Sequence, residues 1–137
     1  MIKKLKTIML VDDDFNTNLY NKIIIKSMNI TEQIITFQNG KLALDYLINK
    51  DGGGAYPQPD IILLDINMPL MNGWEFIEHY NELIKEQQAQ ILIAMLTSSI
   101  NYEDEEKALN SNLVKEFISK PLNKNKINEI LEKYFTK

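Results

Sequence analysis

Five polar side chains in this sequence are of the types that bind or transfer phosphoryl groups, and each belongs to the polar stretch that follows a short apolar run. They are the carboxylates of Asp12, Asp13 and Asp65, the hydroxyl of Thr97 and the ammonium group of Lys120. Crowded carboxylates repel one another unless a cation neutralises them, and Mg²⁺ prefers oxygen ligands of this kind. A lysine and a hydroxyl beside them would stabilise charge on a transferring phosphoryl group, and one carboxylate could serve as the nucleophile.

These side chains can meet only if the apolar runs before them are strands of one sheet. The runs at residues 8–11, 61–64 and 91–96 are continuous rather than alternating, as expected for parallel strands buried on both faces. Residues 34–37 and 117–119 are weaker candidates. In an open α/β sheet, ligands bind beyond the carboxyl ends of the strands, where the strand order reverses. We therefore expect the five polar side chains to converge at that edge.

Helical periodicity fills the intervals between the runs, and it predicts helices that pack an apolar stripe against the sheet. The first stripe consists of Phe15, Leu19 and Ile23, widened by Ile24 and Met28. Strands that alternate with helices in this way, five times over, predict an α/β fold with right-handed crossovers and helices on both faces. The remaining helical segments are Ala43, Leu44, Leu47 and Ile48; Phe76, Ile77, Tyr80 and Ile84; the weaker, acidic residues 102–109; and Ile127, Ile130, Leu131, Tyr134 and Phe135.

Length and composition predict one soluble globular domain. The chain has 137 residues, of which 45% are hydrophobic and 25% charged, and it has no cysteine for a disulfide or a thiolate metal site. The net charge is −4 and all fifteen basic residues are lysine, which disfavours nucleic-acid binding. The basic N-terminus is followed by only a short apolar run, so we expect no signal peptide, no membrane span and a cytoplasmic location. Residues 51–59, rich in glycine and proline, predict a long surface loop.

Four segments at the predicted strand ends resemble the receiver domain family of two-component signalling, which is related to the chemotaxis response regulator. One such segment would be a weak signal, but four in the right order make the resemblance specific, and it covers essentially the whole chain. It implies a flavodoxin-like, doubly wound (βα)5 three-layer sandwich with a parallel sheet of order 2-1-3-4-5. It also implies a single receiver domain over residues 1–137, without an output domain. The segments are Val11-Asp12-Asp13-Asp14, Leu64-Asp65-Ile66-Asn67-Met68-Pro69 through Asn72-Gly73, Leu96-Thr97-Ser98 and Lys120-Pro121-Leu122.

By position, the resemblance makes Asp65 the residue that accepts the phosphoryl group. Asp13 is then a direct ligand of Mg²⁺, and Asp12 acts mainly through a metal-bound water. Asn67 contributes its backbone carbonyl, and Asp65 itself completes the protein ligands. Asp14 is not expected to be a ligand; it could instead cap the helix that begins near residue 15.

The resemblance also implies how the phosphoryl group is bound and sensed. Lys120 pairs with the carboxylate and the phosphate, and the Thr97 hydroxyl moves to bond the phosphate. Ser98 adds a backbone N–H. The movement of Thr97 is coupled to an aromatic residue on the fifth strand, here Phe117, where many relatives carry tyrosine. Phenylalanine has no hydroxyl to bond the neighbouring loop.

The leading hypothesis is a signalling switch phosphorylated by a sensor histidine kinase or a histidine phosphotransfer protein. It would signal through the surface formed by the fourth helix, fifth strand and fifth helix, to a downstream effector protein, as a monomer or a weak phosphorylation-dependent homodimer. It would be no enzyme beyond catalysing its own phosphorylation and dephosphorylation. Two alternatives remain: a phosphorylation-independent docking module, or a phosphohydrolase with an aspartate nucleophile. The second is disfavoured because Asn67 stands where such enzymes carry a general acid.

Overall fold

Five strands form one parallel sheet of order β2-β1-β3-β4-β5, with a helix after each strand. The computed structural model describes residues 4–90, 92–98 and 101–135. Both the α/β class and the predicted strand order are confirmed. The elements are β1 (Leu5–Val11), α1 (Phe15–Met28), β2 (Thr31–Phe37), α2 (Gly40–Ile48), β3 (Ile61–Asp65), α3 (Gly73–Asn81), the 3-10 helix η1 (Lys85–Gln87), β4 (Leu92–Thr97), α4 (Tyr102–Asn110), β5 (Val114–Ser119) and α5 (Lys124–Tyr134).

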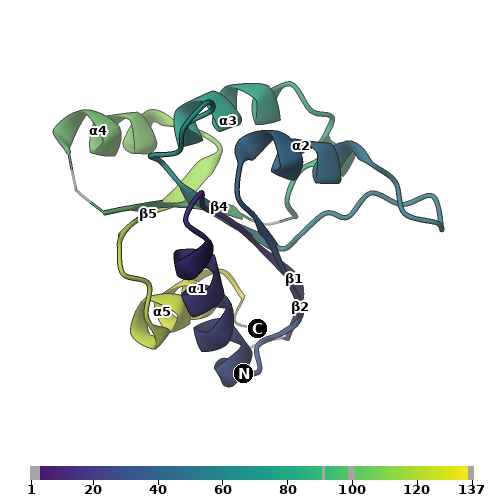
Figure 1. Cartoon of the computed structure of the whole chain (residues 1–137), viewed down its shortest axis with the longest axis horizontal. Coiled ribbons are helices and arrows are strands. Elements are labelled where there is room, and N and C mark those ends of the chain that lie inside the picture. The colour runs from purple at the N-terminus through teal and green to yellow at the C-terminus, as the bar shows by residue number, and fades with distance from the viewer. Residues whose placement is uncertain (1–3, 91, 99–100, 136–137) are drawn as a thin grey trace.

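The helices cover the two faces of the sheet in separate layers (Figure 1): α2, α3 and α4 lie on one face, and α1 and α5 lie on the other. Alternate residues of each strand point to opposite faces. In β1, for example, Met9 and Val11 join the core with α2 and α3, whereas Ile8 and Leu10 join the core with α1 and α5. The continuous apolar runs are therefore explained by burial on both faces, as the sequence predicts.

All five α-helices begin directly after an aspartate or asparagine whose side chain accepts a backbone N–H of the first turn. Such caps are worth about 1 kcal/mol each. The predicted capping role of Asp14 is confirmed, because its carboxylate accepts the N–H of Asn16 at 2.9 Å. The other caps are Asn39, Asn72, Asn101 and Asn123.

The predicted strands are all present, and the loop expected at residues 51–59 lies between α2 and β3. Ile91, which the sequence places at the start of the fourth strand, lies outside the described residues. Among the described helices, none has the length and apolar character needed to cross a membrane.

The prediction for the first helix is confirmed for Ile24 and Met28, which pack against the core, but it is wrong for the other three residues of the stripe. Phe15, Leu19 and Ile23 are 62%, 46% and 59% exposed, although their spacing predicts a core-facing stripe. The buried residues of α1 are instead Asn18, Asn21 and Ile25. The pattern fails because two of the three buried positions are polar, and an analysis of apolar periodicity places such residues in solvent.

Candidate functional site

Three carboxylates meet at the carboxyl ends of β1 and β3, as the sequence predicts. Asp12, Asp13 and Asp65 each offer an oxygen atom, and these atoms lie within 4.8 Å of one another. Asp12 and Asp65 are buried, whereas Asp13 is exposed. β1 and β3 are neighbours in the sheet, with Val11 opposite Leu64, so the residues that follow them are brought side by side. Asp13 therefore forms the side of the cluster that opens to solvent.

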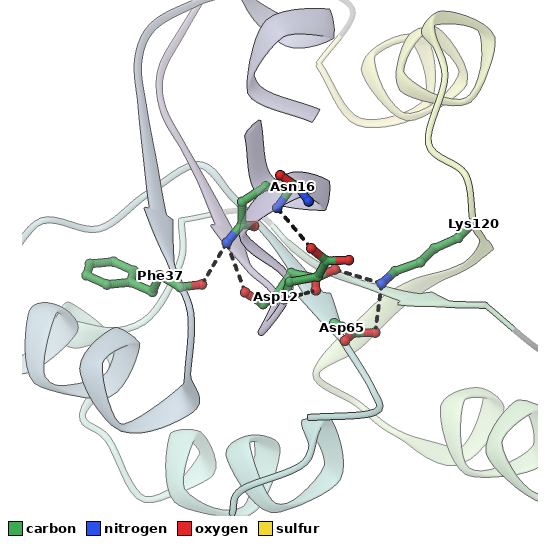
Figure 2. A network of polar contacts seen from close by, with 7 residues as sticks. Asp12, Asn16, Phe37, Asp65 and Lys120 are labelled. Atoms are coloured by element: carbon green, nitrogen blue, oxygen red, sulfur yellow. Dashed lines mark hydrogen bonds and ion pairs between the residues drawn. The ribbon is translucent and has the colours of Figure 1, made fainter. Parts of the chain in front are cut away.

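Lys120 joins this cluster from the loop after β5, more than a hundred positions away in the sequence. Its Nζ lies 2.7 Å from Oδ2 of Asp12 and 3.1 Å from Oδ1 of Asp65, and Figure 2 shows the lysine reaching between the two carboxylates. The backbone N–H of Lys120 donates to the carbonyl of Thr97 at 2.6 Å, which ties this loop to the end of β4. One cation thus partly neutralises two buried anions.

The charges of the cluster shift the pKa values of two of its groups. Burial is the main cause that raises the pKa of Asp65 from 3.8 to about 6, and the charge of Asp12 adds to it, while Lys120 acts in the opposite direction. For Lys120, burial alone would lower the pKa, but the hydrogen bond and charge of Asp12, followed by Asp65, outweigh burial and raise it. The lysine is therefore a permanent cation, and Asp65 carries negative charge that its neighbours do not fully balance.

This donor set fits a hard divalent cation. All three groups supply oxygen, one of them faces solvent, and the cluster holds more negative charge than Lys120 can neutralise. Mg²⁺ takes carboxylate oxygens and keeps several waters, which an open side allows. An added positive charge would also offset the repulsion from Asp12, which adds to the effect of burial on the pKa of Asp65.

The remaining residues that the sequence assigns to the site lie at the same sheet edge, with different exposure. Thr97, the last residue of β4, is fully buried, whereas Ser98 is exposed. Asn67 is exposed and lies two residues beyond Asp65. The N–H of Ile66 donates to Leu96 O at 3.1 Å, so the start of the loop after β3 is fixed to β4. This hydrogen bond fixes the backbone at the sheet edge. The phosphate-binding roles of Thr97 and Ser98 and the metal-binding role of Asn67 stay predictions.

Phe117 lies away from the acidic cluster. It is half-buried on β5 opposite Met95, and it lines an open groove of 390 Å³ together with Ala108 and Leu109 of α4. The only tryptophan, Trp74 on α3, donates its indole N–H to Asp104 of α4 at 2.8 Å. The acidic helix α4 therefore packs against β5 and is also hydrogen-bonded to α3.

Two further residues hydrogen-bond the backbone beside the carboxylates: Asn18, which the sequence analysis did not single out, and Gly73, which it quoted only as part of a matching segment. Asn18 of α1 donates its side-chain amide to the carbonyls of Asp12 and Phe37, at 2.9 and 3.1 Å (Figure 2). Gly73 begins α3, and its N–H donates to Ile66 O at 2.7 Å. The spacing of Asn18, Asn21 and Ile25 along one helix face could have revealed the first, but only if polar residues are allowed in a buried stripe.

Replacing Gly73 with alanine should destabilise the fold, because the start of α3 is packed directly onto the backbone at Asp65. A Cβ at this position would lie 2.8 Å from Asp65 O and 2.9 Å from the Ile66 Cα. Overpacking against backbone costs about 1–3 kcal/mol. Gly52→Ala is the control, since nothing lies within 4 Å of a Cβ there. Denaturant unfolding measures both variants, and equal stability of Gly73→Ala and wild type would contradict this close packing.

Comparison with known proteins agrees with the fold. Residues 8–132 match the family model of the response regulator receiver domain. A crystal structure of a two-component response regulator from Cytophaga hutchinsonii superposes with a TM-score of 0.85 and 33% identity, covering 96% of this chain and 97% of that one. The chain is also similar to the two-component response regulator 24 of Arabidopsis thaliana, with 32% identity over 127 residues, 93% of this chain and 82% of the relative.

Some relatives are much longer than this chain. The protein-glutamate methylesterase/protein-glutamine glutaminase of Desulfotalea psychrophila is 36% identical over 94 residues, which are 66% of this chain. The chain spans only 23% of the length of that relative. The match therefore concerns a receiver-like region within a larger protein.

Proposed function

Because the chain belongs to the response regulator receiver domain family, we propose that it is a phosphorylation switch in which Asp65 accepts a phosphoryl group in a Mg²⁺-dependent reaction. The observation that carries the proposal is the buried Asp65 carboxylate, which lies 3.1 Å from Lys120 and within 4.8 Å of two further carboxylates. A buried ion pair is a poor source of stability, because the desolvation penalty can exceed the Coulombic gain. The ion pair of Lys120 with Asp65 at the carboxyl edge of the sheet is better explained by a role in phosphoryl transfer than by a gain in stability.

The phosphoryl donor is a phosphohistidine, carried by a sensor histidine kinase or a phosphotransfer protein. An oxygen of the Asp65 carboxylate attacks phosphorus, and an O–P bond forms as the P–N bond breaks. The electron pair of that bond stays on the imidazole nitrogen, and the product is an acyl phosphate on Asp65. Hydrolysis by water later returns inorganic phosphate and the free carboxylate. The chain thus catalyses only its own phosphorylation and dephosphorylation.

Mg²⁺ would be held by the carboxylates of Asp13, Asp65 and, through water, Asp12, together with the backbone carbonyl of Asn67. When bound there, it would neutralise the negative charge that develops on the phosphoryl oxygens. The exposure of Asp13 leaves this side of the cluster open for a partly hydrated ion.

Lys120, Thr97 and Ser98 bind the transferred group. Lys120 already contacts Asp65, so its ammonium group needs only a small displacement to reach a phosphoryl oxygen. The Thr97 hydroxyl donates a second hydrogen bond, and the backbone N–H of Ser98 donates a third. Preorganised donors of this kind stabilise the transition state without a reorganisation cost.

The added phosphoryl group changes the charge at the site by about −1.5 to −2. The hydroxyl of Thr97 must move to donate a hydrogen bond to it. Thr97 ends β4, and α4 begins at Tyr102, so a shift of Thr97 is passed to the start of that helix. Phe117 lines the groove below α4 and follows the shift. The α4-β5-α5 surface therefore differs between the two states, and a downstream effector protein binds one of them.

Incubation with acetyl phosphate, with and without Mg²⁺, tests this proposal through the role of Lys120. Lys120→Met removes the cation that contacts Asp65, so the rate of phosphorylation should fall at least about tenfold, which corresponds to about 1.4 kcal/mol in the transition state. The affinity for Mg²⁺ should not fall, because the lysine no longer competes for Asp12. The measurement is intact-protein mass against time, with a parallel Mg²⁺ titration.

Lys124→Met is the matched control for this variant. It removes the same charge four residues further along, from an exposed position at the start of α5. Its rate should stay within about twofold of wild type, because an exposed charge outside the cluster is screened by solvent. Equal rates for Lys120→Met and Lys124→Met would reject the assignment of Lys120.

A further inference from the structure

Asn18 stands out as a buried amide whose hydrogen bonds all serve the backbone behind the acidic cluster. It is 4% exposed, and its Nδ2 donates to Asp12 O at 2.9 Å and to Phe37 O at 3.1 Å. Figure 2 shows both bonds, which run to the labelled residues Asp12 and Phe37. Phe37 O also accepts the N–H of Asp12 at 3.0 Å. One side chain of α1 therefore joins the carboxyl ends of β1 and β2.

The carbonyl oxygen of the Asn18 amide is not stabilised at this position. Oδ1 of Asn18 is buried and has no hydrogen-bond partner in the part of the chain that the structure describes. A buried acceptor without a partner costs about 1–3 kcal/mol. A leucine at this helix position would pack against the sheet without that cost. The value of Asn18 must therefore lie in its two donated bonds, one to the Asp12 carbonyl and one to the Phe37 carbonyl.

The hydrogen bonds at Asp12 hold the two peptide units on either side of this residue. Each unit is planar, so the bond from Asn18 to the Asp12 carbonyl orients the Asp12–Asp13 peptide, and the bond from the Asp12 N–H to Phe37 O orients the Val11–Asp12 peptide. The same turn is pinned once more, because Asp12 Oδ1 accepts the N–H of Asp14 at 2.9 Å. The carboxylate of Asp13 is exposed, makes no hydrogen bond or ion pair with the described residues, and so remains available to a cation.

We propose that Asn18 is a positioning residue of the metal site, which holds the Asp12–Asp13 turn in the geometry that lets both carboxylates face one cation. This inference rests on the proposed function, because it assigns a purpose to Asn18 only if the cluster binds Mg²⁺. Asn18 itself touches neither the metal nor the phosphoryl group. It acts through the Asp12 carbonyl, and its loss widens the range of orientations that Asp13 samples.

Two substitutions at Asn18 test the inference, with one matched control on the same face of α1. Asn18→Leu replaces the amide by an apolar group of similar size, and Asn18→Ser is small enough not to disturb the packing. Asn21→Leu is the control: Asn21 is 3% exposed, and among the described residues its side chain makes no hydrogen bond to either strand. All three variants remove one buried asparagine amide, but only the first two release Asp12.

The first readout is the dissociation constant for Mg²⁺ in the absence of any phosphoryl donor. We expect it to rise about tenfold in both Asn18 variants, which is the lower end of the effect of removing a hydrogen-bond partner that orients a metal ligand. In Asn21→Leu it should stay within about twofold of wild type. Values for the Asn18 variants that equal that of wild type would overturn the inference.

The second readout needs no metal and separates positioning from general stability. Amide hydrogen exchange should become faster at Asp12 and Asp14 in the Asn18 variants, while the amides of β3 keep their wild-type protection. A uniform loss of protection across the sheet would mean that Asn18 is merely structural, and it too would overturn the inference. If wild type itself fails to bind Mg²⁺, the proposed function fails first and the inference falls with it. Failure of the Asn18 variants to differ from a wild type that binds Mg²⁺ removes the inference alone.

Discussion

Asp65→Asn should carry no phosphoryl group after incubation with acetyl phosphate and Mg²⁺, under conditions in which wild type gains one. An amide has the shape of the carboxylate but is not a nucleophile toward phosphorus, so the loss should be complete rather than partial. The other groups of the cluster remain in place, because asparagine can still accept a hydrogen bond from Lys120. Intact-protein mass measures the result, and an undiminished adduct would show that another residue is modified.

The same variant should be more stable than wild type at neutral pH in the absence of Mg²⁺. Burial and the charge of Asp12 raise the pKa of Asp65 from 3.8 to about 6 in the folded protein, so the ionised form disfavours folding. The stability that wild type has below pH 3.8 is lost as the pH rises through about 6, and a neutral asparagine does not lose it. Denaturant unfolding at pH 4 and pH 7.5 should therefore show a difference between the two proteins that grows with pH.

The stability measurement also serves as a folding control for the phosphorylation result. If Asp65→Asn is at least as stable as wild type at pH 7.5 and is still not phosphorylated, misfolding does not explain the loss of phosphorylation. A variant that is less stable than wild type at that pH would contradict the electrostatic description of the cluster.

Asp13→Asn should weaken Mg²⁺ binding about ten- to a hundredfold, which is about 1.4–2.8 kcal/mol. Asp13 is the exposed carboxylate of the cluster, so its charge is available to an ion without desolvating a buried group. Asparagine keeps the shape and the oxygen but removes the charge. A Mg²⁺ titration followed by the fluorescence of Trp74, or by backbone amide shifts, gives the dissociation constant.

Asp14→Asn is the matched control, because it removes the same charge one residue further along. The carboxylate of Asp14 caps α1 through the N–H of Asn16, and asparagine caps a helix equally well. Its Mg²⁺ affinity should fall no more than about threefold, the effect of a nearby charge that is not a ligand. Equal losses in both variants would mean that the cluster attracts cations only through its net charge.

The fold could be predicted from the sequence because its signals are local. Buried parallel strands produce continuous apolar runs, which mark the five strands, although β1, β2 and β5 each begin three residues before the predicted run. The position of the site follows from the fold, since parallel strands present their carboxyl ends at one edge. Asp12, Asp65 and Lys120 could therefore be grouped without any knowledge of distances.

The contacts that the sequence did not predict are those in which tertiary packing overrides periodicity. Phe15, Leu19 and Ile23 form a regular apolar stripe, yet they are exposed, while Asn18 and Asn21 are buried. Helical periodicity alone does not distinguish a polar residue that hydrogen-bonds strand carbonyls, as Asn18 does, from one that hydrogen-bonds water. The hydrogen bond from Trp74 to Asp104 joins residues 30 positions apart, on α3 and α4, and it likewise has no local signal.

The most direct test of the central claim is to locate the modified residue in wild type. Protein treated with acetyl phosphate, with and without Mg²⁺, is reduced with borohydride, which converts an aspartyl phosphate to homoserine, and is then analysed by tandem mass spectrometry. We predict homoserine at position 65 and only in the sample that contained Mg²⁺. Homoserine at another aspartate, equal modification without Mg²⁺, or none in either sample would contradict the assignment of Asp65 as a metal-dependent phosphoacceptor.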